Sequence, residues 1–375
     1  MNEEKSNPLF DLDKAKRYAK TRLILSLAST LLSLIILMVL VGSSVSHQWA
    51  NGAKALSNSR IMQTTLYFSF FSLTFLILEW PLHFYSSFVL EHRYQLSNQT
   101  LSKWFLEDAK RQALSFLVAL GLVLALYAVI HQTGRLWWLW AWVGWVFFSI
   151  VMSELLPVLV IPLFYKYQSI ENPKLKEHMI RLVEPYKLKI KNIYSLNLSK
   201  NTKKTNAMFC GLGHTKRVVL ADTLVQQFSE DEIDSVVAHE VGHFHYHHLW
   251  KGIAFSSLSS FLIFKLADLL FRNFQNVLHI SDLSDVAGFP FLCLIFFSFL
   301  TLISPLQNWF SRRMERQADA FSLQITQNKN AFIQTMKKLS QTNLSDPSPH
   351  PIVEFLFYSH PSIQKRIAFA QGKMR

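Results

Sequence analysis

Long apolar stretches alternate with polar segments along the whole chain of 375 residues. A helix needs about 20 apolar residues to cross about 30 Å of hydrocarbon, because each residue adds about 1.5 Å. Six stretches reach this length. We expect each of them to be a transmembrane helix: Leu23–Val45, Ile61–Val89, Gln112–Ile130, Leu136–Phe164, Gly252–Phe271 and Val286–Trp309.

These stretches divide the chain into five parts. We expect 1–22 to be a cytoplasmic N-terminal segment, 23–164 a membrane region with four spans, 165–251 a cytoplasmic part with a small sheet, 252–309 two further spans, and 310–375 a cytoplasmic C-terminal part. The lysines and arginines concentrate in alternate polar segments, and such segments stay in the cytoplasm.

Composition excludes a disordered chain and argues against a purely soluble enzyme. Half of the residues are hydrophobic and 17% are charged, whereas soluble proteins carry about 25% charged residues. The net charge of +13 fits cytoplasmic loops beside anionic lipid better than a nucleic-acid partner. We therefore expect the lipid bilayer, and no nucleic acid, among the partners.

The part from 165 to 251 shows a mixed α+β pattern. A helix is expected over Asn172–Glu184, and strands are expected over Lys187–Ser199 and Arg217–Leu220. Two interpretations of the strand at Arg217–Leu220 stay open. It either offers its edge to an extended peptide or is an ordinary buried strand.

A polar helix with metal-ligating residues follows the second strand. Ser229 and Glu232 have the spacing of a capping box at its start. His239 and His243 are four residues apart, so they lie on one face of the helix. Two imidazoles so placed can bind one Zn²⁺, and Glu240 beside them can act as the base for a bound water.

A catalytic zinc takes three protein ligands and keeps one position open for water. Glu315 is the candidate third ligand, because it follows the sixth span on a helical segment with Asp319 one turn further on. Asp319 can then accept the free N–H of a ligand histidine. The alternative is a charged surface helix on which Arg312, Arg313 or Arg316 pairs with Glu315.

Three further histidines lie just beyond the motif: His245, His247 and His248. They either mark the membrane surface before the fifth span or compete for the metal. A His-rich membrane zinc transporter or sensor without protease activity is the alternative function that would use them. Glu240 argues against it, because transport needs no base.

Seven ordered motifs resemble the type I CAAX prenyl proteases, which are integral-membrane zinc metallopeptidases. The resemblance runs from about residue 60 to the C-terminus. Its motifs are Glu91–Thr100, Ile161–Lys166, Asn206–Gly211, Val219–Leu224, His239–His243, Ser311–Asp319 and Tyr358–Pro361.

The resemblance assigns roles residue by residue. It implies that His239, His243 and Glu315 hold the zinc, one ion per chain, with Glu240 as general base and Asp319 behind the ligands. Asn206 matches a substrate-binding residue. His360 and Arg366 match C-terminal residues that contact substrate or the developing oxyanion, and they are therefore candidates for both catalysis and substrate binding.

The resemblance also implies the architecture: a mainly α, polytopic membrane protein with helices around an internal chamber and a small cytoplasmic zincin-type α+β part. Eukaryotic members have seven spans and this chain shows six, so we expect six or seven. The implied substrates are peptides or proteins at or in the membrane, including prenylated ones. The implied location is the bacterial cytoplasmic membrane or the endoplasmic reticulum, with the active site on the cytoplasmic side.

Overall fold

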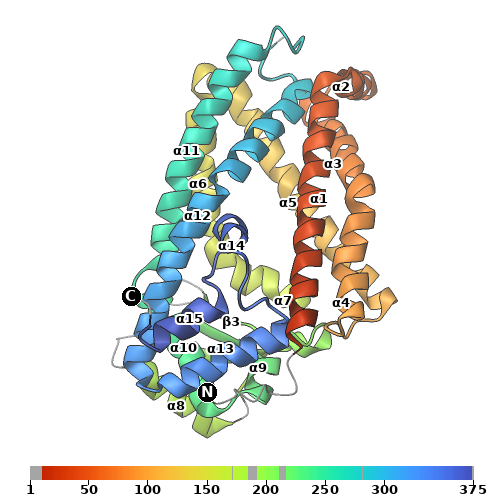
Figure 1. The fold of residues 1–375 in the computed structure, drawn as a ribbon. Helices are drawn as coiled ribbons and strands as arrows, with labels where there is room; N and C mark the ends of the chain where they lie inside the picture. Colours follow the sequence, from red (N-terminus) through yellow and green to blue (C-terminus); the bar gives the residue numbers. More distant parts are fainter. Residues whose placement is uncertain (1–10, 171, 185–191, 211–216, 281, 374–375) are drawn as a thin grey trace.

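The computed structural model describes residues 11–170, 172–184, 192–210, 217–280 and 282–373. It has two halves (Figure 1). One is a ring of long helices, and the other is a compact part built on a small sheet at one end of the ring.

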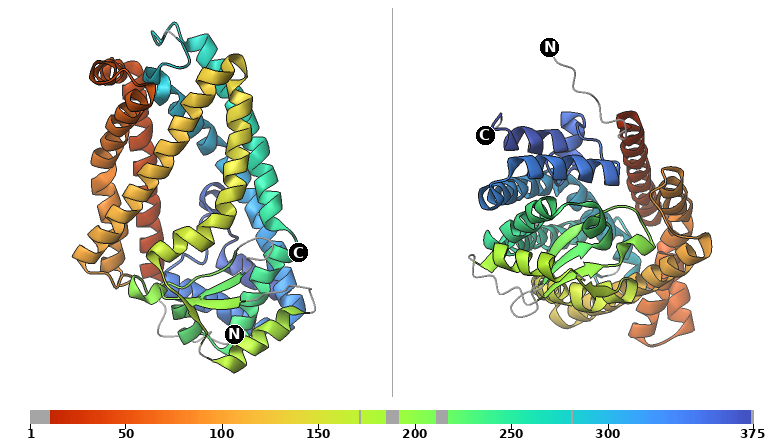
Figure 2. Two further views of the ribbon diagram at one scale, coloured as in Figure 1. Left: turned by 180° about the vertical axis from the view of Figure 1, so that it is seen from behind. Right: turned by 90° about the horizontal axis from the view of Figure 1, so that it is seen from below.

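Each of the six predicted spans has most of its residues in one long helix: α1 (Leu12–Gly42), α3 (Arg60–Phe84), α5 (Leu101–Thr133), α6 (Trp137–Leu155), α11 (His248–Phe274) and α12 (Phe289–Thr326). Five continuous helical stretches of the described residues are long and apolar enough to cross a membrane. One of them, Leu101–Phe164, is divided by a 3₁₀ turn at Gly134–Leu136. Its two parts, α5 and α6, run in opposite directions (Figure 2), so the five stretches contain six long helices of the described residues.

Several of these helices extend beyond the apolar stretches that predicted them. The Asp11 side chain caps α1 and the Thr100 side chain caps α5, and each cap lies more than two turns before the apolar stretch begins. A capped polar helix is stable in water, because its first N–H groups find an acceptor. The last of the long helices, α12, continues past Trp309, so Glu315 lies on the same continuous helix as the final span.

Two π-helical turns lie where α3 and α6 approach the compact half. The segment Tyr85–Val89 follows Pro81, and the segment Leu156–Val160 contains Pro157. Proline lacks the N–H that the helical ladder needs, and such breaks are where helices bend. The short helices of the ring half are α2 (Val45–Leu56), α4 (Leu90–Arg93) and α7 (Ile161–Phe164).

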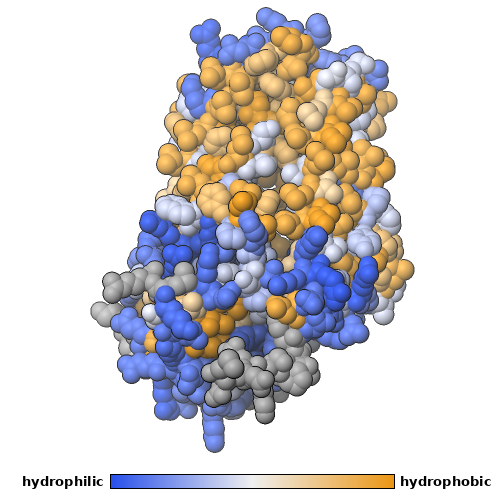
Figure 3. All heavy atoms as spheres, in the orientation of Figure 1, coloured by the Kyte–Doolittle hydropathy of each residue, from blue (hydrophilic) through white to orange (hydrophobic). Residues whose placement is uncertain are grey.

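An aromatic core joins the helices of the ring. Tyr67 and Phe68 of α3, Trp137 of α6 and Phe289 of α12 are all buried in it. The outer surface of this half is apolar in a broad band, whereas the compact half is mainly hydrophilic (Figure 3). Leu302, for example, is 80% exposed. Such a band fits the hydrocarbon of a bilayer.

The sheet of the compact half has the strand order β1–β2–β4–β3. Its strands are β1 (Tyr167–Ser169), β2 (Asn192–Leu196), β3 (Ala207–Cys210) and β4 (Arg217–Ala221). Strand β2 is antiparallel to β1 and parallel to β4, and β4 is antiparallel to β3. The strand predicted at Arg217–Leu220 is β4. Because β4 is paired on both sides, the interpretation as a buried strand is correct and the peptide-edge interpretation is wrong.

Strand β2 lies within the other predicted strand, Lys187–Ser199, of which residues 187–191 are outside the described residues. The helix expected over Asn172–Glu184 is α8 (Pro173–Val183). The other helices of this half are α9 (Asp222–Gln227), α10 (Glu230–His245), α13 (Lys329–Asn343), α14 (Pro351–Phe357) and α15 (Ile363–Ala370). Val218 and Leu220 of β4 pack with Val237 and Val241 of α10 and with Phe321 of α12 in one buried cluster.

Polar contacts attach the sheet to the membrane helices. Glu91 of α4 accepts hydrogen bonds from Tyr18 Oη of α1 (2.5 Å) and Lys204 Nζ (2.8 Å). Glu107 of α5 accepts one from Asn201 Nδ2 (2.7 Å). These carboxylates are shielded from solvent, so their bonds count for more than exposed ion pairs do. Residues of the Glu91–Thr100 motif thus help to hold the two halves together.

Candidate metal centre

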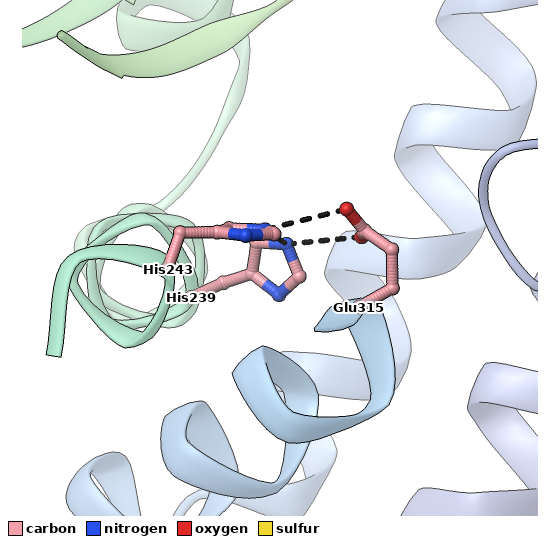
Figure 4. Close-up of side chains that lie close together, drawn as sticks. All are labelled: His239, His243 and Glu315. Carbon is pink, nitrogen blue, oxygen red and sulfur yellow. Dashed lines mark hydrogen bonds and ion pairs between the residues drawn. The ribbon is translucent and has the colours of Figure 1, made fainter. Parts of the chain in front are cut away.

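Helix α10 presents the two histidines of the motif. The Ser229 side chain accepts from the Glu232 N–H, and the Glu232 side chain accepts from the Ser229 N–H, which completes the predicted capping box. One face of α10 packs on the sheet through Val237 and Val241. Another faces α12, and there His239 and His243 point toward Glu315 (Figure 4).

The three side chains meet at one point. His239 Nε2 lies 3.1 Å from His243 Nε2. Glu315 places Oε2 3.3 Å from His239 Nε2 and Oε1 3.3 Å from His243 Nε2. A tetrahedral ion with bonds of about 2.0–2.1 Å holds its ligand atoms about 3.3 Å apart. The observed spacings therefore match the size of a metal site.

The protein alone leaves this point poorly satisfied. Glu315 Oε2 is buried and accepts no hydrogen bond of good geometry, although His360 Nδ1 lies 2.8 Å away. The two Nε2 atoms face each other, and only one of them could donate a hydrogen bond to the other. Two imidazoles and a carboxylate are a donor set that binds a catalytic metal. Among the described residues, these three form the one such cluster of His, Cys, Asp and Glu.

Asp319 and Arg366 lie behind His239. Asp319 Oδ1 is 2.9 Å from His239 Nδ1, and the Asp319 side chain is 1% exposed. Arg366 of α15 donates to both oxygens of Asp319, at 2.8 and 2.5 Å. The carboxylate therefore holds the His239 proton on Nδ1, so the lone pair of Nε2 points to the metal site.

The electrostatics of the site favour a cation. Burial lowers the pKa of His239, but the hydrogen bonds to Asp319 and Glu315 more than offset it and raise the pKa to about 10. The same carboxylates that attract a proton to this imidazole attract a metal ion when the imidazole is neutral.

Glu240 follows His239 on α10 and reaches toward β3. Its Oε2 accepts the Phe209 N–H at 3.1 Å. Burial raises the pKa of Glu240, and the nearby imidazoles of His239 and His243 oppose that rise. A carboxylate that is partly desolvated and held by one hydrogen bond is a competent proton acceptor. No sequence signal identified Phe209 as its partner.

A cavity of about 320 Å³ is lined by His239 and Glu315 of the cluster. Asn206, Glu240, His360 and Arg366 all line it, so the structure brings the sequence-predicted residues together. Asn206 immediately precedes β3 and is exposed, and His360 approaches Glu315 from the loop after α14. Arg366 is buried and directed at Asp319, so its predicted contact with substrate stays a prediction.

The three extra histidines do not form a second cluster. His245 and His247 are exposed, whereas His248, the first residue of α11, is buried. His248 Nδ1 lies 2.9 Å from His243 Nδ1, which is the ring nitrogen that faces away from Glu315. This geometry gives no support to the alternative of a transporter that binds its metal through these residues.

Two family models match this chain, one in each half. The family model described as Peptidase family M48 matches residues 169–374. The model described as CAAX prenyl protease N-terminal, five membrane helices, matches residues 6–166. In the described part of that range, this chain has the four long helices α1, α3, α5 and α6, and α2 of 12 residues is too short to span a bilayer.

Relatives and a solved structure extend the likeness over most of the chain. The metalloprotease YhfN of Bacillus subtilis is 29% identical over 96% of this chain and 85% of its own. CAAX prenyl protease 1 of Saccharomyces cerevisiae is 30% identical, over 82% and 72%. The crystal structure of S. mikatae Ste24p superposes with a TM-score of 0.86 at 25% identity, over 99% of this chain and 91% of that one.

Proposed function

Since the chain belongs to peptidase family M48 and has the membrane part of the CAAX prenyl proteases, we propose that this membrane metalloprotease is a zinc endopeptidase. Its zinc ligands are His239, His243 and Glu315, and its general base is Glu240. The observation that carries the proposal is the spacing of the candidate ligand atoms of three side chains, 3.1–3.3 Å, beside a partly desolvated carboxylate.

Zinc, when bound, polarises the peptide carbonyl and lowers the pKa of water toward 7. Glu240 takes the proton of the attacking water as the oxygen adds to the carbonyl carbon. The same carboxylic acid then gives that proton to the leaving nitrogen as the C–N bond breaks. The Phe209 N–H restrains Glu240 during both transfers, because it donates to one of the two carboxylate oxygens.

Strand β3 is the element best placed to align a substrate. Among the strands of the described residues it pairs only with β4, and the Phe209 N–H on its other side already points into the site. An extended peptide that pairs with this edge has its backbone fixed beside Glu240. Asn206, at the start of β3, then holds the peptide through its exposed amide.

His360 is the candidate donor to the developing oxyanion. Its imidazole lies at the rim of the cavity, with Nδ1 2.8 Å from Glu315. A donor at this rim can stabilise charge on the carbonyl oxygen. Arg366 acts indirectly, because it holds Asp319, which contacts His239. A direct contact with a substrate carboxylate would be an additional role for Arg366.

The substrates we propose are membrane-associated proteins, including prenylated CAAX-type proteins. The ring of apolar helices and the matched N-terminal family model support substrates that approach within the bilayer. The concentration of basic residues in alternate polar segments supports a cytoplasmic active site. The membrane is the cytoplasmic membrane of a bacterium or the endoplasmic reticulum.

The test combines a base variant with metal analysis. Glu240→Gln should retain zinc at one ion per chain but lose at least about a thousandfold in kcat, because the base is gone and the ligands remain. Prenylated and unprenylated forms of one peptide are compared, with and without a chelator, to define the substrate class. An active, correctly folded Glu240→Gln protein would refute the general-base assignment.

A further inference from the structure

The two candidate ligand histidines differ in the group that contacts the Nδ1 atom of each ring. Asp319, a buried carboxylate, accepts from the Nδ1 of His239. Among the described residues, no carboxylate contacts the Nδ1 of His243. The Nδ1 of His248 lies there instead, at 2.9 Å. The other nitrogen of His248, Nε2, lies 2.9 Å from Oε1 of Gln317 on α12.

The proton positions along this chain of contacts follow from one requirement. His243 must keep the lone pair of Nε2 free to bind a cation, so its proton sits on Nδ1. His248 Nδ1 must then accept that proton in a hydrogen bond. The proton of neutral His248 therefore sits on Nε2, where Gln317 Oε1 accepts it. With His243 Nε2 reserved for the cation, only this arrangement gives His243 Nδ1, both ring nitrogens of His248 and Gln317 Oε1 a hydrogen-bond partner.

The backbone turn between α10 and α11 places His248 beside His243. Helix α10 ends at His245, and His247 adopts a left-handed conformation with φ of 55°. A non-glycine residue at positive φ is uncommon, although histidine tolerates it better than most residues. This turn starts α11 at His248, whose side chain points back at His243 and is 4% exposed.

We propose that His248 is a positioning residue for the metal site: it accepts the Nδ1 proton of His243, is itself oriented by Gln317, and so strengthens the hold of His243 on the cation. The proposal rests on the proposed zinc site. His248 cannot ligate the same ion at the same time as His243, because it stands on the opposite side of the His243 ring from Glu315.

The expected effect is on metal affinity. Removing such a partner of a ligand histidine weakens metal binding about 10- to 100-fold. His248→Leu should therefore raise the dissociation constant for Zn²⁺ by that factor in the purified full chain, measured by competition with a chelator. His248→Asn should recover most of the affinity, because its Oδ1 can accept from His243 Nδ1 in place of the imidazole.

Gln317 provides a second, independent probe. Gln317→Leu should weaken zinc binding by a smaller factor, because His248 keeps its place but loses its orientation. In the His248→Leu background, Gln317→Leu should cause no further loss, since the chain of hydrogen bonds is already broken. The control is His247→Asn, which changes an exposed neighbouring imidazole and keeps a residue that tolerates positive φ.

Metal-free protein separates positioning from a merely structural role. If His248 positions His243, the His248→Leu and His248→Asn proteins unfold at similar temperatures without metal and differ in the rise that zinc produces. Unchanged zinc affinity in His248→Leu, or equally weak binding in His248→Leu and His248→Asn, would overturn the proposal. Glu315→Gln is the reference variant. If both Glu315→Gln and His248→Leu bind zinc normally, the proposed metal site is wrong. If Glu315→Gln loses zinc affinity and His248→Leu does not, only the role of His248 is rejected.

Discussion

The close approach of α10 and α12 at Gly242 makes a sharp test of the metal site. A Cβ at this position would lie 3.0 Å from the Cα of Ala318 and 3.2 Å from the Cβ of Phe321. Ordinary contacts of that kind start at 3.4 Å, so Gly242→Ala must separate the helices by at least about 0.4 Å. His243 and Glu315, on either side of this contact, would move apart with them.

The expected result has two parts. Overpacking of this kind lowers the free energy of unfolding by about 1–3 kcal/mol. Metal sites tolerate ligand shifts of about 0.2 Å, so zinc affinity should fall by at least about tenfold. Both are measured on the purified protein, by thermal unfolding with and without zinc and by competition with a chelator.

Gly252→Ala is the matched control, because a Cβ there meets nothing within 4 Å. It should leave zinc affinity unchanged and cost no stability, since alanine favours a helix over glycine by about 1 kcal/mol. If Gly242→Ala behaved like Gly252→Ala in both assays, the close contact would not control the ligand spacing, and this reasoning would be refuted.

Two further predictions concern buried groups near the site. Asp319→Ala should lower the free energy of unfolding by about 3–5 kcal/mol and zinc affinity about 10- to 100-fold, because Arg366 loses its countercharge and His239 loses its acceptor. Chemical unfolding and chelator competition measure these changes, and a loss below about 1 kcal/mol would contradict the burial argument. Burial raises the pKa of the Cys210 thiol to about 11, so at pH 8 its reactive thiolate is about a hundredfold rarer than that of a thiol with a pKa of about 9. In a Cys293→Ala background, alkylation followed by mass spectrometry should be correspondingly slow and should speed up as the pH rises, whereas a rate equal to that of a free-cysteine peptide would be evidence against the shift.

The sequence was sufficient to locate the long apolar helices but not to predict their ends. Apolar length identifies the part of a helix that must lie in hydrocarbon, and it is silent on how far a polar helix continues. The continuation of α12 beyond Trp309 and the start of α1 at Leu12 depend on capping and tertiary packing. The burial of β4 likewise depends on β2 and β3, which pair with it from other parts of the chain.

Local spacing predicted each half of the cluster, whereas the meeting of Glu315 with the two histidines was implied by the family resemblance. His239 with His243, and Glu315 with Asp319, are each four residues apart on a helix. The partners behind them come from distant segments. Nothing in the local pattern linked Gln317 to His248, 69 residues away, because only the turn at the end of α10 and the packing of α12 bring them together.

The order of the ligands along the polypeptide has a consequence for biosynthesis. His239 and His243 precede α11, and Glu315 follows the apolar part of α12. When α10 has folded in a growing chain, the proposed site still lacks Glu315, which arrives only after α11 and the apolar part of α12. On the proposed mechanism, the chain therefore gains proteolytic competence only at the final stage of membrane insertion.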